Sequence, residues 1–195
     1  MVKIGFIVEG GAEKIILESK SFRDFLNELN IKAVGIFDAE GEGNFKVESK
    51  KIFRFVQILN DRKANYIVLW TDKEDDPCVS HTLNSVYHFD NKKQVVLVSV
   101  KALESWFLAD SDALSKTLKA KIQHPDPENL TGSAFDEVKN TFIKHTGRGI
   151  SKSKNRLAHK MVRNGFSIQN AAKHPECESA KYFINKLKTL SKEKE

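Results

Sequence analysis

The chain has 195 residues, 40% of them hydrophobic, and a formal net charge of +6 at neutral pH. This composition supplies a core and excludes a disordered chain, and no apolar run reaches the ~18 residues that a membrane-spanning helix needs. Cys78 and Cys177 have neither a metal-ligand nor a redox spacing. The amino terminus has the pattern of a buried strand, not of a signal peptide, so we expect reduced thiols in a cytoplasmic protein.

Four short runs rich in valine and isoleucine predict buried strands, at residues 2–8, 32–37, 65–70 and 94–100. Apolar residues at helical spacing fill the intervals between them, over residues 15–29, 52–59 and 79–89. This alternation predicts an α/β fold with a Rossmann-like, mainly parallel four-stranded sheet and helices on both of its faces.

The pattern after residue 100 is helical and increasingly basic. Helices are expected over residues 103–118, 134–144, 154–164 and 179–190. We therefore expect an α/β core over residues 1–120 and a basic helical extension over residues 121–195, packed on the core as one structural unit.

Glu9 ends the first predicted strand and precedes two glycines that permit a tight turn. An acid at the end of a buried strand needs a cation or hydrogen-bond donors, which favours a functional role for Glu9. Glu13 lies in the first turn of the following helix, where favourable interaction with the helix dipole explains it at least as well.

Asp72 and Glu74 follow the third predicted strand. Side chains alternate along an extended chain, so these two carboxylates are expected on the same side. Hard oxygen ligands in this arrangement suit Mg²⁺, which takes one or two carboxylates together with water and phosphate oxygens. An acidic loop without a metal is the alternative for this segment.

Glu104 lies among leucine and aromatic residues just after the fourth predicted strand. A carboxylate in such an environment should be paired, protonated or bound to a metal. The alternative is a solvent-facing position on an amphipathic helix. Because the carboxyl ends of parallel strands meet at one sheet edge, Glu104 is expected near Glu9 and Asp72.

Basic residues dominate the carboxy-terminal third of the chain. Such a charge surplus suits a nucleic-acid backbone, although a solvated helical face is the simpler interpretation. The residues predicted to contact nucleic acid are Lys144, Arg148, Lys152, Lys154, Arg156, Lys160 and Arg163. The histidines show no metal-ligand spacing and receive no predicted role.

Four segments together resemble the Toprim fold of topoisomerases, primases and overcoming-lysogenization-defect (OLD) nucleases. They also resemble, more closely, a Toprim-like family of unknown function that is often encoded near restriction-modification and phage-defence genes. The Leu-Glu-Ser-Trp-Phe-Leu-Ala-Asp stretch is the most specific of the four segments, which are residues 8–13, 71–74, 103–110 and 179–183.

The resemblance implies roles for particular residues. Glu9 would be the Toprim glutamate, and Asp72 and Glu74 would fill the two Asp-x-Asp positions, with Glu74 a departure from the pattern. Lys152 and Lys154 match basic positions near the carboxyl end of such proteins. Lys154 would stabilise charge on a transferring phosphoryl group, or act simply in phosphate steering.

The sequence thus favours an Mg²⁺- or Mn²⁺-dependent phosphoryl-transfer enzyme acting on DNA or RNA, a nuclease-like hydrolase that could serve in phage defence with a partner ATPase. The predicted catalytic residues are Glu9, Asp72, Glu104 and Lys154, and the predicted metal ligands are Glu9, Asp72 and Glu74. A non-catalytic nucleic-acid-binding or regulatory module is the main alternative. A small-nucleotide phosphatase or nucleotidyl enzyme is the third.

Overall fold

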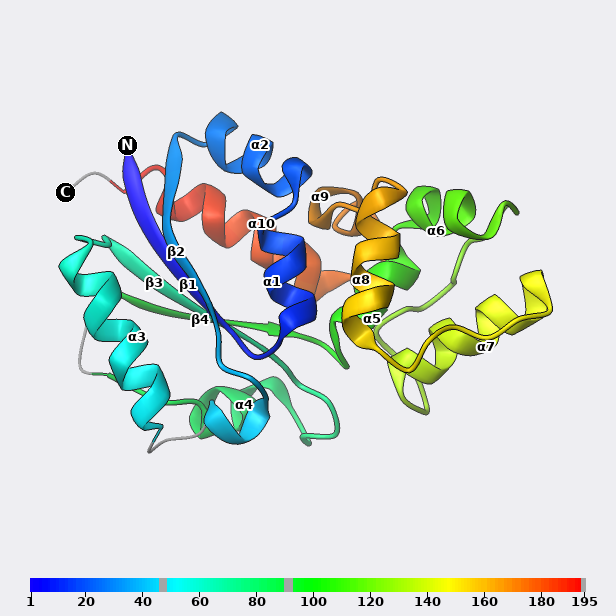
Figure 1. Cartoon of the computed structure of the whole chain (residues 1–195), viewed down its shortest axis with the longest axis horizontal. Helices are drawn as coiled ribbons and strands as arrows, with labels where there is room; N and C mark the ends of the chain where they lie inside the picture. The colour runs from blue at the N-terminus through cyan, green and yellow to red at the C-terminus, as the bar shows by residue number, and fades with distance from the viewer. Residues whose placement is uncertain (46–48, 90–92, 194–195) are drawn as a thin grey trace.

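A four-stranded parallel sheet forms the centre of the computed structural model, which describes residues 1–45, 49–89 and 93–193 (Figure 1). The strand order is β2-β1-β3-β4, and every pairing is parallel. The strands are β1 (Val2–Val8), β2 (Ile31–Asp38), β3 (Tyr66–Asp72) and β4 (Gln94–Ser99). The predicted α/β class is confirmed.

Helices cover both faces of the sheet and extend beyond its carboxyl edge (Figure 1). Those on the first half of the chain are α1 (Gly11–Leu17), α2 (Lys20–Glu28), the short 3₁₀ helix η1 (Glu42–Asn44), α3 (Lys50–Asp61) and α4 (Val79–Ser85). Those that follow β4 are α5 (Leu103–Ala109), α6 (Ser111–Leu118), α7 (Ala134–Thr146), α8 (Lys154–Arg163), α9 (Ile168–Ala171) and α10 (Glu178–Leu190).

Alternating side chains of the strands feed two hydrophobic cores, one on each face. Phe6 and Trp70 pack with α1, α2 and α10, in a core that continues into α5, α6 and α8. Ile7 and Leu69 point to the other face and pack with residues of α3. Both faces are therefore buried, which explains why the strands are nearly continuous apolar runs in the sequence.

Two helices that periodicity predicted as continuous are each divided in the structure. Helix α1 ends at Leu17, and Ser19 caps α2, accepting a hydrogen bond from the Phe22 backbone N–H at 3.2 Å. Asp110 separates α5 from α6 and accepts from the N–H groups of Ala113 and Ser167, both at 3.0 Å. The helical spacing of apolar residues continues across each break, so only the capping side chains of Ser19 and Asp110 indicate that the helix is divided.

The helices after β4 return to the core at several places. Helix α8 lies beside α1, and α10 lies on the sheet, where the Phe183 and Trp70 rings are 5.0 Å apart (Figure 1). Glu128, in the loop after α6, accepts hydrogen bonds from the backbone N–H and hydroxyl of Ser179 at the start of α10. We propose that the α/β core ends at residue 120 and that the basic extension begins at residue 121.

Within the described residues, each helix is too short or too polar to cross a bilayer.

Candidate acidic site at the carboxyl edge of the sheet

Glu9 and Asp72 meet where the strand order reverses. Strand β1 lies between β2 and β3, so the connections that follow β1 and β3 leave toward opposite faces at this point. Open α/β sheets bind their ligands in the crevice formed at such a reversal. Glu9 Oε2 accepts hydrogen bonds from Thr71 Oγ1 at 2.5 Å and from the Asp72 backbone N–H at 3.3 Å.

Asp72 is the last residue of β3 and links that strand to α5. Its side chain is buried, and Oδ1 accepts a hydrogen bond from the Leu103 backbone N–H at 3.1 Å. The residue at the N-cap position of α5, Ala102, has no side chain able to do this. Asp72 therefore caps α5 from a neighbouring strand and fixes Glu104, the next residue along, beside the site.

Glu104 is 1% exposed, and neither of its carboxylate oxygens has a hydrogen-bond partner among the described residues. Burial raises the pKa of this carboxyl, and the positive charge of Lys154 opposes the rise. A buried carboxylate without donors is strongly disfavoured unless a cation or a proton neutralises it. The solvent-facing position considered for Glu104 is wrong.

Glu13 belongs to the same cluster, although the sequence pattern did not favour it over an ordinary helix-terminal acid. It is 6% exposed, and its pKa is raised to about 7 by burial and by repulsion from Glu104 and Glu9, against a lowering effect of backbone hydrogen bonding. Burial and repulsion from Glu13, Glu104 and Glu9 also raise the pKa of Asp72 well above its usual range. The signal that could have identified Glu13 is its position four residues after Glu9, across the glycine turn.

Lys154 provides positive charge for these carboxylates. Its Nζ lies 3.8 Å from Glu104 Oε2 and 3.9 Å from Glu74 Oε1, and its side chain is about half exposed. Burial lowers the pKa of Lys154, but attraction to Glu104, Asp72 and Glu74 outweighs that effect and raises it overall. The lysine is therefore held as a cation at the edge of the cluster.

Close packing of α8 against α1 places Lys154 there. Lys154 is the first residue of α8, after the N-cap Ser153, whose hydroxyl accepts from the Arg156 N–H at 3.3 Å. Asn155 lies over Gly11, and a Cβ on Gly11 would be 2.6 Å from Asn155 Nδ2. The second glycine of the turn thus allows the helices to approach, which is what brings a basic helix to the acidic edge.

Glu74 lies near Asp72 as predicted, since both carboxylates attract Lys154, but strand alternation is not the reason. Strand β3 ends at Asp72, and Glu74 has φ 46°, in the left-handed region that side chains other than glycine rarely adopt. Lys101, after β4, has φ 64°, and its carbonyl accepts from the Glu74 N–H at 2.7 Å. This hydrogen bond joins two unusual backbone conformations at the site. The half-exposed Glu74 carboxylate lies near Lys154 because the chain turns after β3.

A buried aromatic cluster supports these residues from below. The Trp70 and Trp106 rings stack 5.0 Å apart, and the Phe183 ring packs against both. Trp70 Nε1 donates to Ser99 Oγ at 2.7 Å, and Trp106 Nε1 donates to Ser179 Oγ at 2.8 Å. Trp70 lies two residues before Asp72, and Trp106 lies two residues after Glu104. The packed aromatic cluster therefore fixes the positions of both carboxylates.

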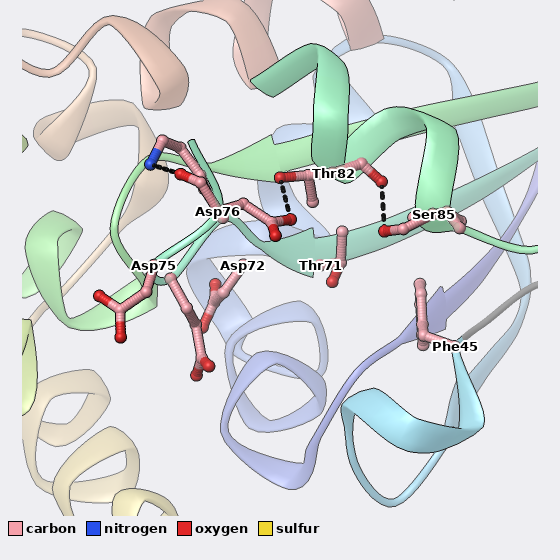
Figure 2. Close-up of a pocket in the computed structure, with 10 residues that line it drawn as sticks. Phe45, Thr71, Asp72, Asp75, Asp76, Thr82 and Ser85 are labelled. Carbon is pink, nitrogen blue, oxygen red and sulfur yellow. Dashed lines mark hydrogen bonds between the residues drawn. The ribbon is translucent and has the colours of Figure 1, made fainter. Parts of the chain in front are cut away.

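A pocket of about 260 Å³ opens between the end of β3 and α4 (Figure 2). Figure 2 shows Asp76 directed to Thr82, whose hydroxyl donates to Asp76 Oδ2 at 2.7 Å, whereas Asp75 points away from α4. Asp72 lines this pocket and also belongs to the carboxylate cluster. Asp75 and Asp76 are thus loop residues, and Asp76 braces α4 through Thr82.

The predicted nucleic-acid residues lie on α8, on the end of α7 and in the loop between them. Apart from Lys154, they are exposed and have no acidic partner in the ion pairs found among the described residues. Lys160 Nζ lies 4.6 Å from the centre of the Phe142 ring. Because α8 begins at the carboxylate cluster, its basic residues start beside the acidic site. We use the term basic surface for the other exposed basic residues of α7, α8 and the loop between them, which are Lys144, Arg148, Lys152, Arg156, Lys160 and Arg163.

The residues of the cluster fit a hard divalent cation. Carboxylate oxygens are the preferred ligands of Mg²⁺ and Mn²⁺, and Glu104 carries two buried oxygens without donors. In the conformation described, no three histidine, cysteine, aspartate or glutamate side chains of residues 1–45, 49–89 and 93–193 form a ready-made metal site. The fold and the site together define an α/β protein with a buried, incompletely neutralised carboxylate cluster at its sheet edge.

No protein-family model matches the sequence, and no curated protein has significant sequence similarity to it. A solved structure of the C-terminal region of the Burkholderia pseudomallei OLD protein is similar to this one, with 14% sequence identity and a TM-score of 0.48. The alignment covers 96% of this chain and 98% of that one. Similarity at this level transfers neither an activity nor a ligand, so the roles proposed below rest on the geometry of the site.

Proposed function

We propose that the protein is a divalent-metal-dependent phosphoryl-transfer enzyme acting on nucleic acid, with nuclease-like hydrolysis as the reaction. The observation that carries this proposal is the buried carboxylate of Glu104, which has no hydrogen-bond donor among the described residues. It lies near other carboxylates, and its ion-pair partner in the described structure is Lys154. A protein retains such an arrangement at a cost in stability, and perturbed carboxylates gathered at a sheet edge are typical of functional sites.

The proposed metal ligands are Glu9, Asp72 and Glu104, with Glu13 and Glu74 as the adjoining carboxylates. Glu9 and Asp72 are held by the hydrogen bonds from Thr71 and Leu103, so their positions are fixed before any ligand binds. Bound Mg²⁺ or Mn²⁺ would activate water and offset the negative charge that develops on phosphate.

Lys154 is proposed to stabilise the transferring phosphoryl group. Its ammonium group already lies at the rim of the cluster, where it interacts with Glu74 and Glu104. A cation that moves from carboxylate to phosphate stabilises the charge that develops during transfer. The exposed basic surface on α7 and α8 would bind the backbone of the nucleic acid, with the steep salt dependence that such contacts produce.

A cleavage assay tests the proposal. Wild-type protein is incubated with single-stranded and duplex DNA and RNA in Mg²⁺, in Mn²⁺ and in EDTA. Asp72→Asn is the matched variant, because its amide oxygen can still accept the hydrogen bond from Leu103 while the charge is lost. Metal-dependent cleavage by the wild type that falls at least about 100-fold in Asp72→Asn supports the proposal. Equal cleavage by the two proteins contradicts it.

One observation favours a second candidate function. Lys154 forms ion pairs with Glu104 and Glu74, and the carboxylates of the described residues are not arranged as a metal-binding site in this conformation. In a non-catalytic nucleic-acid-binding or regulatory module, this lysine would neutralise the acids permanently. That alternative predicts salt-dependent binding of nucleic acid by the wild type without cleavage under any metal condition.

The motif resemblance of residues 103–110 further suggests a place in phage defence, together with a partner ATPase. Phage plating on cells that express wild-type or Asp72→Asn protein, with and without neighbouring genes, tests this part. Protection by the wild type that Asp72→Asn lacks is the expected result.

A further inference from the structure

A second pocket lies on the other side of the 74–75 loop from the pocket in Figure 2. Its volume is about 160 Å³, and its charged lining residues are the carboxylates of Glu74, Asp75 and Glu104 and the two lysines Lys101 and Lys154. The volume accommodates a phosphate group. The buried, donor-free carboxylate of Glu104 therefore borders a small polar cavity that carries two lysines.

Lys101 is an unusual lysine in this setting. Its side chain is only 21% exposed, and its backbone has the left-handed φ of 64°. That conformation is unfavourable for a residue with a Cβ. The ion-pair partner of Lys101 is Asp75, 3.9 Å away and fully exposed. An ion pair whose carboxylate is fully exposed contributes little stability, so it does not account for keeping a lysine here.

The charges of the pocket complement a phosphate group once the carboxylates are neutralised. Without a metal, Lys154 interacts with Glu74 and Glu104. A divalent cation shared by Glu104 and its neighbours would offset their charge and release Lys154 from its carboxylate partners, while Lys101 would keep only the fully exposed Asp75 as a partner. Lysine binds phosphate in proteins as a point charge, and two such charges that line one pocket favour an anion in it.

We propose that Lys101 binds a phosphate group of the nucleic-acid substrate in the pocket that it lines with Lys154 and Glu104. The inference rests on the proposed function and extends it, because it assigns the substrate phosphate to one side of the 74–75 loop. The opposite pocket has a larger excess of negative charge and disfavours phosphate more strongly, because its charged lining residues are four carboxylates and one lysine: Asp72, Glu74, Asp75, Asp76 and Lys73.

The test is a binding measurement with a ligand that contains a single phosphate. Thymidylyl-thymidine and its uncharged methylphosphonate analogue are titrated into protein in Ca²⁺, which suppresses turnover, and the dissociation constants are measured by NMR. Lys101→Met keeps the Cβ and the aliphatic stem but loses the charge, and Lys101→Arg restores a charge. Lys188→Met, on the exposed last turn of α10, is the control.

The proposal predicts that the wild type prefers the charged dinucleotide by roughly tenfold. Lys101→Met should lose most of that preference and bind the methylphosphonate as the wild type does, whereas Lys101→Arg and Lys188→Met should retain it. A wild-type preference that persists in Lys101→Met overturns the proposal. Equal weakening of both ligands also overturns it, because that result indicates a structural role.

Failure of the proposed function gives a different result. A wild type that binds neither Mn²⁺ nor either dinucleotide would remove the basis of both proposals. A wild type that binds Mn²⁺ and cleaves nucleic acid but whose preference is unaffected by Lys101→Met would overturn the assignment of Lys101 alone.

Discussion

Lys154 Nζ lies 3.8 Å from Oε2 of Glu104, a carboxylate that is 1% exposed and has no hydrogen-bond donor among the described residues. The lysine comes from the first turn of α8 and the glutamate from α5, so the pair joins the basic extension to the sheet edge. A protein cation at this position competes with a metal ion for the same carboxylates. Removing the charge of Lys154 should therefore change the metal affinity of the cluster.

Removing the charge of Lys154 should strengthen metal binding and weaken the metal-free fold. In Lys154→Met, the affinity for Mn²⁺ is expected to rise by several-fold to about tenfold, because a competing cation has been removed. The melting temperature without metal should fall at pH 8, where the cluster carries most charge. Calorimetric titration and thermal unfolding measure the two effects, and the exposed Lys152→Met serves as control. Unchanged values in both experiments would show that Lys154 is merely solvated.

Glu13 gives the stability of the metal-free protein a specific pH dependence. Its pKa rises from 4.5 to about 7 on folding, so the folded state holds the proton more tightly than the unfolded state. The resulting contribution is present below pH 4.5 and is lost as the pH rises through about 7. Since one pKa unit corresponds to about 1.4 kcal/mol, the full effect is roughly 3 kcal/mol.

Glu13→Gln should therefore lose less stability than the wild type between pH 4.5 and pH 8. Urea denaturation at several pH values measures the difference. Glu18→Gln, at the exposed end of the same helix, is expected to follow the wild-type curve. Parallel curves for wild type and Glu13→Gln would contradict the assignment of a raised pKa to Glu13.

Glu128 should matter for stability because it satisfies several donors at the start of α10. It accepts from the Ser179 N–H and hydroxyl and from the Cys177 thiol, and burial raises its pKa. Glu128→Ala leaves these donors without a partner and is expected to cost about 2–4 kcal/mol in the free energy of unfolding. Glu176→Ala, at an exposed position nearby, should cost less than about 0.5 kcal/mol. Similar costs for the two variants would contradict this role of Glu128.

The basic surface on α8 should contribute to nucleic-acid affinity through phosphate charge alone. Arg156→Ala is expected to weaken binding to unrelated sequences by a similar factor and to reduce the slope of log K against log salt by about 0.7–0.9. Fluorescence anisotropy across a salt series measures this slope, with Lys188→Ala as a matched loss of one charge elsewhere. An unchanged slope for Arg156→Ala would place the nucleic acid on another surface.

The sequence predicts the sheet and the strand-end carboxylates well, for a physical reason. Parallel strands buried on both faces give continuous apolar runs, and their carboxyl ends must share one edge. The amino-acid pattern alone therefore places Glu9 and Asp72 together, and the Asp72 N–H does donate to Glu9. Glu104 could be predicted as a site residue because it is a carboxylate among strongly apolar neighbours in the sequence.

What the sequence did not predict depends on backbone geometry and on contacts distant in the chain. Alternation gave the wrong reason for the position of Glu74, because the strand had already ended and the chain turns there with positive φ. Glu13 was not favoured over an ordinary helix-terminal acid and Lys101 received no role, since their environments arise from packing against residues far away in the sequence. The breaks at Ser19 and Asp110 were missed because the apolar period continues across them.

Calorimetric titration of Mn²⁺ into the metal-free protein at low ionic strength tests the central claim most directly. We predict that the wild type binds Mn²⁺ and releases protons on binding below about pH 7, because Glu13 and Asp72 must give up protons for the cluster to carry its full charge. Asp72→Asn should bind at least about 100-fold more weakly with its fold intact by circular dichroism. Equal Mn²⁺ binding by the two proteins, or none by the wild type, would contradict the claim that this cluster is a metal site.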